Sequence, residues 1–201
     1  ADIMTGMGHR ARAASKAMGL LTAPDRTRAL VAIAAAIRAA APEILAANVA
    51  DMAAARAKGL SGAMLDRLAL DEKRLEGIAA GVETVAALPD PIGRELARWT
   101  RPNGLDIARI AVPLGVIGII YESRPNVTVD AGVLCLRSGN AAILRGGSES
   151  AHTSHALADA MRGALKNEEM PVDAIQLVAT TDREAVGYML AGLEGTLDVI
   201  V

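Results

Sequence analysis

The sequence predicts an α/β protein in which an N-terminal helical segment and a β-hairpin precede a doubly wound parallel sheet. Three observations support this fold class. Alanine-rich stretches with helical spacing fill most of residues 1–93. Two alternating segments flank a turn within residues 94–112. From residue 113, short apolar runs alternate with helical patterns, which is typical of βαβ units.

The segment 1–93 is predicted to be helical because its helices carry start and stop signals. Thr22 and Asp25 fit a capping box with a proline in the first turn. Pro42 restarts a helix, Gly59 suits a C-cap, and Asp71 suits an N-cap. The apolar side chains of these helices recur at helical spacing and are expected to pack in the core. The first stripe is Leu30, Ile33 and Ile37, and the last is Leu75, Ile78, Val82 and Val85. Between them, the helix after Pro42 carries Leu45, Val49 and Met52 on its apolar side and Asn48, Asp51 and Arg56 on the opposite side.

Residues 94–112 are predicted to form a β-hairpin. Residues 94–101 and 105–112 alternate in polarity, and Pro102-Asn103-Gly104 supplies the turn between them. An isolated hairpin is only marginally stable in water, so we expect this one to pair with a sheet or with a partner chain.

Residues 113–201 are predicted to alternate strands and helices. The final apolar strand is followed by no turn, helix or polar tail, so we expect the natural polypeptide to continue beyond Val201. The predicted strands are 116–120, 141–144, 174–179 and 197–201, and the predicted helices are 127–137, 149–166 and 183–190, the last capped by Asp182.

The composition excludes several classes of protein. Lys and Arg total 21 against 23 Asp and Glu, so no basic excess exists to bind a nucleic acid. One Trp, two Tyr and no Phe cannot build a base-stacking platform, and a single Cys excludes a disulfide framework. The longest apolar run, Ile110–Tyr121, is too short for a membrane span, and the N-terminus lacks the apolar core of a secretory signal. We therefore expect a cytoplasmic protein that handles a small molecule.

The first candidate site is the loop that follows the first predicted parallel strand. Ligands of open α/β sheets bind beyond the carboxyl ends of the strands. Asn126 has two interpretations: it donates an amide N–H to charge developing on a ligand oxygen, or it caps the next helix. The loop brings a phenol, a carboxylate, a hydroxyl, a guanidinium and an amide together in Tyr121, Glu122, Ser123, Arg124, Pro125 and Asn126.

The second candidate site is the segment Arg145-Gly146-Gly147-Ser148-Glu149, between a strand and a helix. Two glycines permit close backbone approach to a ligand, and a helix N-terminus attracts anions. The spacing matches neither the dinucleotide fingerprint nor the P-loop, so a phosphate or ribose site and an ordinary turn with a cap both stay open. The arginine favours a 2′-phosphorylated ribose, and the serines, with Ser150, are more typical of helix caps than of nucleophiles.

Three further residues invite chemistry but favour structural roles. Cys135 lies in an apolar helical segment and is interpreted as a buried, unreactive thiol. His152 and His155 share a helix face, but no adjacent carboxylate or third His supports a metal, so a solvated or capping role is favoured. We predict no metal site.

Long motifs identify a resemblance to a known family. Residues 113–130 (PLGVIGIIYESRPNVTVD) and 134–149 (LCLRSGNAAILRGGSE) closely resemble the γ-glutamyl phosphate reductases, or glutamate-5-semialdehyde dehydrogenases, of the aldehyde dehydrogenase superfamily. The resemblance covers essentially the whole chain. Earlier segments agree as well: Ala47-Asn48 with Asp51, Gly59-Leu60-Ser61 with residues 65–68, residues 88–91 and residues 102–105.

The resemblance implies an activity and a set of site residues. Members reduce L-glutamate 5-phosphate with NADPH to glutamate 5-semialdehyde and phosphate in proline biosynthesis, through a thioacyl-enzyme. Asn126 matches the oxyanion residue of the superfamily, and Arg145 stands where many relatives have a lysine that contacts the adenosine ribose. Ser148 and Glu149 match the polar pair that follows, with Gly146-Gly147 in place of a single proline. The longer loop Glu122–Pro125 is included among the expected cofactor-binding residues.

One departure dominates the resemblance. The family's nucleophilic Cys lies in a later domain, beyond position 201, so this chain looks like an N-terminal half that is inactive alone. We expect residues 1–93 to be the helical part of the cofactor domain, 94–112 a hairpin that forms a homo-oligomer, and 113–201 a truncated, Rossmann-like NADP-binding part. The alternative is a natural short module that binds a nucleotide or a partner subunit without catalysis. A third reading makes Cys135 catalytic.

Overall fold

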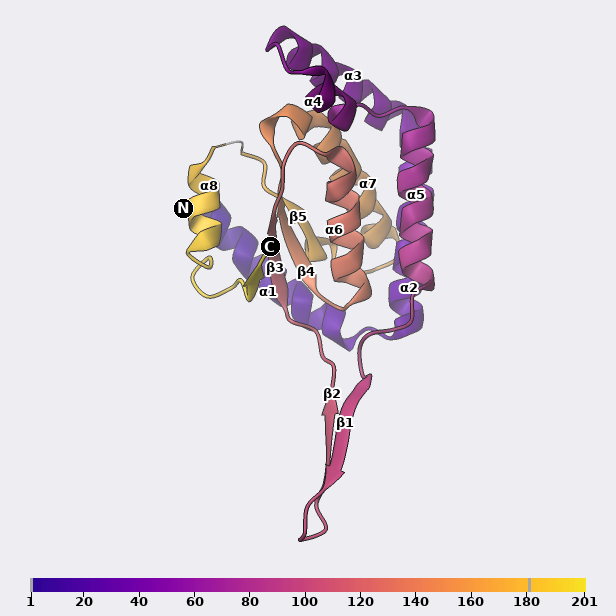
Figure 1. Ribbon diagram of the computed structural model, residues 1–201, viewed down its shortest axis with the longest axis vertical. Helices are drawn as coiled ribbons and strands as arrows, with labels where there is room; N and C mark the ends of the chain where they lie inside the picture. The colour runs from indigo at the N-terminus through magenta and orange to yellow at the C-terminus, as the bar shows by residue number, and fades with distance from the viewer. Residues whose placement is uncertain (1, 181) are drawn as a thin grey trace.

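The structure is a computed structural model that describes residues 2–180 and 182–201. Helices come first, then the hairpin, then alternating strands and helices, in the order that the sequence predicts (Figure 1). The helical segment contains α1 (Asp2–Leu20), α2 (Ala23–Ala39), α3 (Ala41–Ala57), α4 (Gly62–Leu68) and α5 (Glu72–Ala87). The remainder contains β1 (Glu95–Thr100), β2 (Asp106–Ile110), β3 (Val116–Ile120), α6 (Pro125–Arg137), β4 (Ala141–Arg145), the 3-10 turn η1 (Ser148–Ser150), α7 (Ala151–Asn167), η2 (Val172–Ala174), β5 (Ile175–Leu177), α8 (Glu184–Leu190) and β6 (Val199–Ile200).

The parallel sheet has the strand order β5-β4-β3-β6. Val116 pairs with Ala141 and Ile117 with Val199, so β3 lies between β4 and β6. The chain runs from β3 through α6 and α7 to one edge, and then returns through α8 to the opposite side of β3. The predicted doubly wound sheet is confirmed. Its strand order reverses next to β3, which is where ligands of such sheets bind.

Helices cover both faces of the sheet. Helices α6 and α7 lie on one face and α1 on the other, while α2 and α5 form a further layer outside α6 and α7 (Figure 1). One continuous core joins the helical segment to the sheet. Residues from both parts of the chain are fully buried in it, including Leu30, Ile33, Leu136, Ile143, Leu144, Leu157 and Met161.

The local helix signals act largely as the sequence predicts. The Thr22–Asp25 capping box forms, with the N–H of Asp25 donating to Thr22 Oγ1 at 3.3 Å and the N–H of Thr22 donating to Asp25 Oδ2 at 3.1 Å. Gly59 has a φ of +74°, and Asp71 caps α5 by accepting from the N–H of Arg74 at 2.7 Å. The Asp182 prediction is off by one residue, because Arg183 occupies the cap position and Asp182 instead accepts from the N–H of Glu184.

The predicted core stripe of α3 is confirmed at Leu45, which packs against the core, and is wrong at Val49. Val49 is 69% exposed, whereas the polar Asn48 and Asp51 are buried. The reason is tertiary: α3 packs against η1 and α7, and Thr153 of α7 accepts a hydrogen bond from Asn48 and donates one to Asp51. A buried polar side chain is tolerated where such partners exist.

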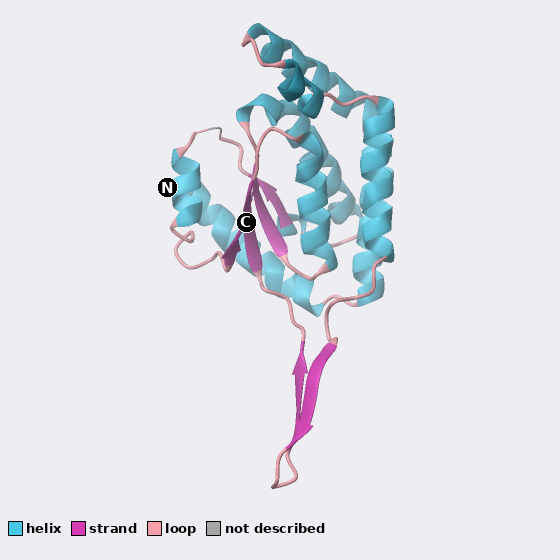
Figure 2. Ribbon diagram, viewed as in Figure 1, coloured by secondary structure: helices cyan, strands magenta, loops and turns pink. Residues whose placement is uncertain are grey.

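The hairpin stands apart from the parallel sheet (Figure 2). Strands β1 and β2 pair antiparallel, with Trp99 opposite Ile107, and every residue of β1 is exposed. Among the described residues, no other strand pairs with the hairpin. The expected sheet or chain partner is therefore not supplied by the described part of this chain.

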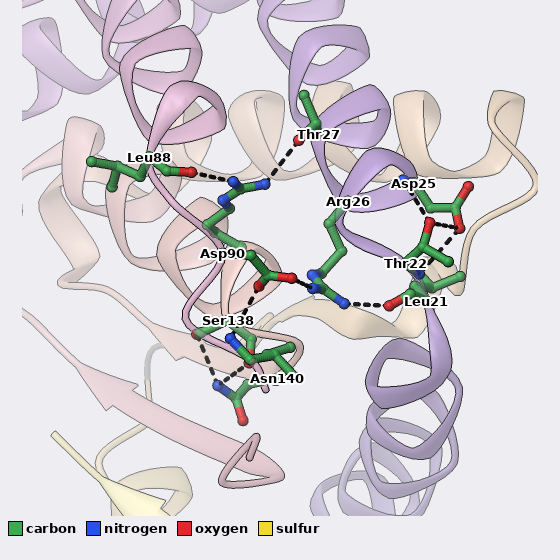
Figure 3. Close-up of polar contacts among 11 residues, drawn as sticks. Leu21, Thr22, Asp25, Arg26, Thr27, Leu88, Asp90, Ser138 and Asn140 are labelled. Atoms are coloured by element: carbon green, nitrogen blue, oxygen red, sulfur yellow. Dashed lines mark hydrogen bonds and ion pairs between the residues drawn. The ribbon is translucent and has the colours of Figure 1, made fainter. Parts of the chain in front are cut away.

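Two buried arginines hold the chain where it enters the hairpin (Figure 3). Arg26, which is 2% exposed, forms an ion pair with Asp90 at 2.6 Å and donates to the carbonyl of Leu21. Arg137 donates to Thr27 Oγ1 at 2.8 Å and to the carbonyl of Leu88. These contacts join α2, the C-terminal end of α6 and the segment after α5, so the base of the hairpin is fixed to the body.

No single helix among the described residues is long and apolar enough to cross a bilayer. Helices α2 and α3 meet the length and composition test only as a pair that is bent by 65°.

Candidate functional site

The loops after β3 and β4 meet at the carboxyl end of the sheet, on the side of α4 and opposite the hairpin (Figure 1). A cleft of about 580 Å³ lies there, between these loops and α4. We name it the strand-end cleft. Its lining includes six of the predicted site residues, namely Glu122, Ser123, Arg124, Arg145, Gly147 and Glu149, together with Leu60, Met64, Arg67, Leu68, Ile120 and Tyr121.

A carboxylate ties the two loops of this cleft together. Ser123 Oγ donates to Glu149 Oε2, and Ser148 Oγ donates to Glu149 Oε1 at 2.9 Å. The hydrogen bond from Ser123 is the main cause that holds the pKa of Glu149 below its usual range. Glu149 is therefore ionised at neutral pH and fixed between the loops.

The paired glycines serve the packing of these loops. A Cβ on Gly147 would lie 2.1 Å from Ser123 Oγ and 2.9 Å from Ser123 N. A Cβ on Gly146 would lie 3.1 Å from ring atoms of Tyr121. The sequence predicted that the glycines permit close approach of a ligand. The close approach in the structure is that of the neighbouring loop.

Tyr121 anchors the start of the loop after β3. Its hydroxyl forms a 2.7 Å hydrogen bond with Thr128 Oγ1, on the first turns of α6. Burial raises the pKa of Tyr121, so the phenol is neutral at physiological pH. Pro125 is buried at the first position of α6. The loop is thus held at both of its ends.

Asn126 lies in a second, adjacent cleft of about 560 Å³, between α4, α5 and α6. We name it the Asn126 cleft. Its lining includes Asp66, Arg67, Ala69, Leu70, Arg74, Gly77, Ile78, Arg124 and Asp130.

The capping interpretation of Asn126 is wrong. Helix α6 already begins at Pro125, and Arg124 occupies the cap position. Asn126 Nδ2 instead donates to Asp130 Oδ2 at 3.0 Å, one turn further along. Partial desolvation by the surrounding cleft is the main cause that raises the pKa of Asp130. The amide is therefore oriented from within the helix and faces a cleft.

The N-terminus of α7 is capped by a residue that sequence reasoning missed. Asp51 of α3, which is 2% exposed, accepts from the N–H groups of His152 and Thr153 at 3.2 and 2.8 Å and from Thr153 Oγ1 at 2.6 Å. Ser150 stands at the cap position but forms no side-chain cap hydrogen bond. An internal carboxylate thus already satisfies the helix end that we expected to attract an anion.

Asn48, one turn before Asp51, extends this buried polar contact to α4. Its Nδ2 donates to the carbonyl of Leu68 at 2.9 Å and to Thr153 Oγ1 at 3.2 Å, and its Oδ1 accepts from the N–H of Leu70 at 2.8 Å. The end of α4 is thereby fixed to α7, beside the strand-end cleft. The one sequence signal for this role is that Asn48 and Asp51 are three residues apart and so lie on the same side of the helix.

The structural role of His152 is confirmed. Its side chain is 70% exposed, and its Nδ1 forms a 2.7 Å hydrogen bond with Asp51 Oδ1. The carboxylate that the sequence lacked nearby therefore comes from another helix. Among the described residues, no group of three His, Cys, Asp or Glu side chains is placed to hold a metal ion.

The predicted burial of Cys135 is also confirmed, and its low reactivity stays a prediction. The side chain lies in the core, and burial raises the pKa of Cys135 to about 12. A thiolate is the reactive form of cysteine, and burial disfavours it here.

Comparisons with known proteins define first the class and then the particular relatives. No family model matches the chain. A probable aldehyde dehydrogenase from Listeria monocytogenes shares the fold, with a TM-score of 0.75 at 13% identity over 99% of this chain and 41% of that one. The chain thus has an aldehyde-dehydrogenase-like fold.

The relatives of higher identity carry one name. A gamma-glutamyl phosphate reductase of Hyphomonas neptunium is 85% identical over the whole chain and 47% of its own length. The crystal structure of gamma-glutamyl phosphate reductase from Thermotoga maritima matches with a TM-score of 0.94 at 38% identity, over 98% of this chain and 47% of that one. The chain is therefore similar to gamma-glutamyl phosphate reductases and spans about half the length of these relatives.

Proposed function

We propose that this chain is half of an enzyme that reduces L-glutamate 5-phosphate to L-glutamate 5-semialdehyde and phosphate with NADPH, in proline biosynthesis. The observation that carries the proposal is the 85% identity to a gamma-glutamyl phosphate reductase along the entire chain. We further propose that the enzyme is cytoplasmic and that this half has no activity by itself.

The residues of the strand-end cleft fit the adenosine ribose of a nicotinamide dinucleotide. A cleft of about 580 Å³ is within the usual size of a ligand site. Arg145, at the end of β4, suits a 2′-phosphate, while Glu149 of the cleft, together with Ser148 beside it, suits ribose hydroxyls. The bound cofactor would supply the hydride. The loops after β3 and β4, which Glu149 ties together, would hold the cofactor.

We propose that Asn126 stabilises negative charge on the acyl oxygen of the substrate. The side-chain amide has two hydrogens, and Asp130 takes one of them, so the other is available to a substrate in the Asn126 cleft. A donor that is fixed before the charge develops needs no reorganisation during the reaction. The orientation that Asp130 gives to the amide is this kind of preparation.

The nucleophile is proposed to lie outside these 201 residues. The burial of Cys135, which raises its pKa to about 12, supports this proposal, because a nucleophilic cysteine needs an accessible thiolate. We also propose that the hairpin joins copies of the full-length enzyme. Its apolar side chains Leu96, Trp99 and Ile110 are exposed, as expected of strands that pair with a partner chain.

The proposal is tested by kinetics of the full-length enzyme. Asn126→Ala should lower kcat by about 10²–10³, the usual effect of removing one oxyanion donor. Arg145→Ala should raise KM for NADPH far more than KM for NADH, because only NADPH carries the 2′-phosphate. An unchanged kcat in the first variant, or equal KM effects in the second, would remove the corresponding role.

A further inference from the structure

Two arginines lie where the two clefts adjoin. Arg67, on α4, and Arg124, at the start of α6, line both the strand-end cleft and the Asn126 cleft. Both side chains are exposed, and they come from segments far apart in the sequence. The fold therefore places two cations beside Asn126.

The guanidinium groups of these arginines are uncommitted. Within residues 2–180 and 182–201, neither Arg67 nor Arg124 forms a side-chain hydrogen bond or ion pair. Arg74, in the same cleft, is the contrast: it donates to the Asp66 carboxylate at 2.6 Å and to the backbone carbonyls of Asp66 and Ala69. Arg74 thus stabilises the turn between α4 and α5, whereas the side chains of Arg67 and Arg124 form no such contacts within the described residues.

Among the described residues, no carboxylate of the Asn126 cleft forms an ion pair with Arg67 or Arg124. Asp66 is engaged by Arg74, and Asp130 accepts from Asn126. In the strand-end cleft, Glu149 is held by two serine hydroxyls. The exposed Glu122 is the other acid that lines that cleft. Two guanidinium groups without carboxylate partners suit a doubly charged phosphate group, which each can bind through two parallel N–H donors.

We propose that Arg67 and Arg124 bind the phosphate group of the acyl-phosphate substrate. This inference rests on the function proposed above. In an acyl phosphate, the carbonyl oxygen and the phosphate are attached to the same carbon, so a carbonyl at Asn126 places the phosphate in the immediate neighbourhood. Arg124 is thereby assigned to the substrate, where the sequence suggested the cofactor.

The buried hydrogen bonds of Asn48, on α3, fix the position of Arg67. Asn48 holds the carbonyl of Leu68, the residue that follows Arg67, and Asn48 also contacts Thr153 of α7. Helix α4 is only seven residues long and would not keep its place through its own hydrogen bonds. The site therefore depends on tertiary contacts rather than on a local motif.

The test uses the full-length enzyme in the reverse direction, with inorganic phosphate as the varied substrate. We expect Arg67→Gln and Arg124→Gln each to raise KM for phosphate about 10-fold or more, with KM for NADP⁺ changed less than about 2-fold. Arg67→Lys should recover part of the loss. Lys73→Gln is the matched control, because Lys73 is an exposed cation on α5 that lines neither cleft.

Two results would overturn the assignment. One is an unchanged KM for phosphate in both glutamine variants, and the other is a rise in KM for NADP⁺ alone, which would place the cofactor phosphate at these arginines. A second measurement does not need activity: phosphate should raise the Tm of the wild-type enzyme and of Lys73→Gln, but not of the two arginine variants. A wild-type enzyme that shows this shift without reductase activity would refute the proposed function and keep the anion site.

Discussion

Replacing Asp51 by alanine should destabilise this protein more than the loss of an ordinary helix cap. Asp51 is buried and accepts hydrogen bonds from two backbone N–H groups and one hydroxyl at the start of α7. Thr153, which supplies two of those donors, is fully buried, so water cannot replace the lost carboxylate there.

The magnitude follows from counting these contacts. Loss of a cap costs about 1 kcal/mol. Each buried donor left without a partner costs about 1–3 kcal/mol more. We therefore expect Asp51→Ala to lower the free energy of unfolding by about 3 kcal/mol or more, a large part of the roughly 5–15 kcal/mol that stabilises a typical domain.

The matched control is Asp71→Ala. Asp71 caps α5 through one hydrogen bond of 2.7 Å to its own helix and is exposed, so its loss should cost about 1 kcal/mol. Urea unfolding of the 201-residue chain, followed by far-UV circular dichroism, measures both variants against the wild type. If Asp51→Ala lowers the free energy of unfolding no more than Asp71→Ala does, the buried hydrogen bonds of Asp51 add nothing beyond an ordinary cap, and the prediction is wrong.

Three further predictions concern other parts of the fold. Cys135 should react with a thiol reagent at pH 8 only as fast as the protein unfolds, since burial raises its pKa to about 12; rapid labelling of the folded chain would contradict this. Gly147→Ala should weaken NADPH binding by the full-length enzyme, because the added Cβ would lie 2.1 Å from Ser123 Oγ; an unchanged Kd in a cofactor titration would show that the loops adjust without cost. The hydrogen-bonded ion pair with Arg12 lowers the pKa of Asp198 below 3.8. The contribution of this ion pair to the free energy of unfolding is therefore complete above that pH and is lost as the pH falls through the folded-state pKa. The stability difference between Asp198→Asn and the wild type should therefore be present at neutral pH and vanish in acid, and a difference independent of pH would refute the assignment.

Local signals in the sequence predicted the order of elements well. The Thr22 capping box, the strand Val116–Ile120 and the turn at Asn103-Gly104 all form where they are predicted. Each depends on residues within a few positions of one another, and the helix and strand periodicities are likewise local. The doubly wound topology follows from these elements because crossover connections between parallel strands have a fixed hand.

The candidate site was predicted only in part. The sequence placed Asn126 and Arg145 after neighbouring strands, and the structure puts them in two adjacent clefts. It gave no sign that Arg67 lines both clefts, since α4 is remote from these loops along the chain.

The sequence by itself determined which segments are helices and strands, the parallel sheet, and the loops at its carboxyl end. Only the tertiary structure decided which side of α3 is buried, that Asp51 rather than a local serine caps α7, and that Gly147 makes room for Ser123. The physical reason is distance along the chain. Asp51 and Thr153 are separated by 102 residues, and a hydrogen bond between them leaves no periodicity, spacing or capping motif that a local pattern could report.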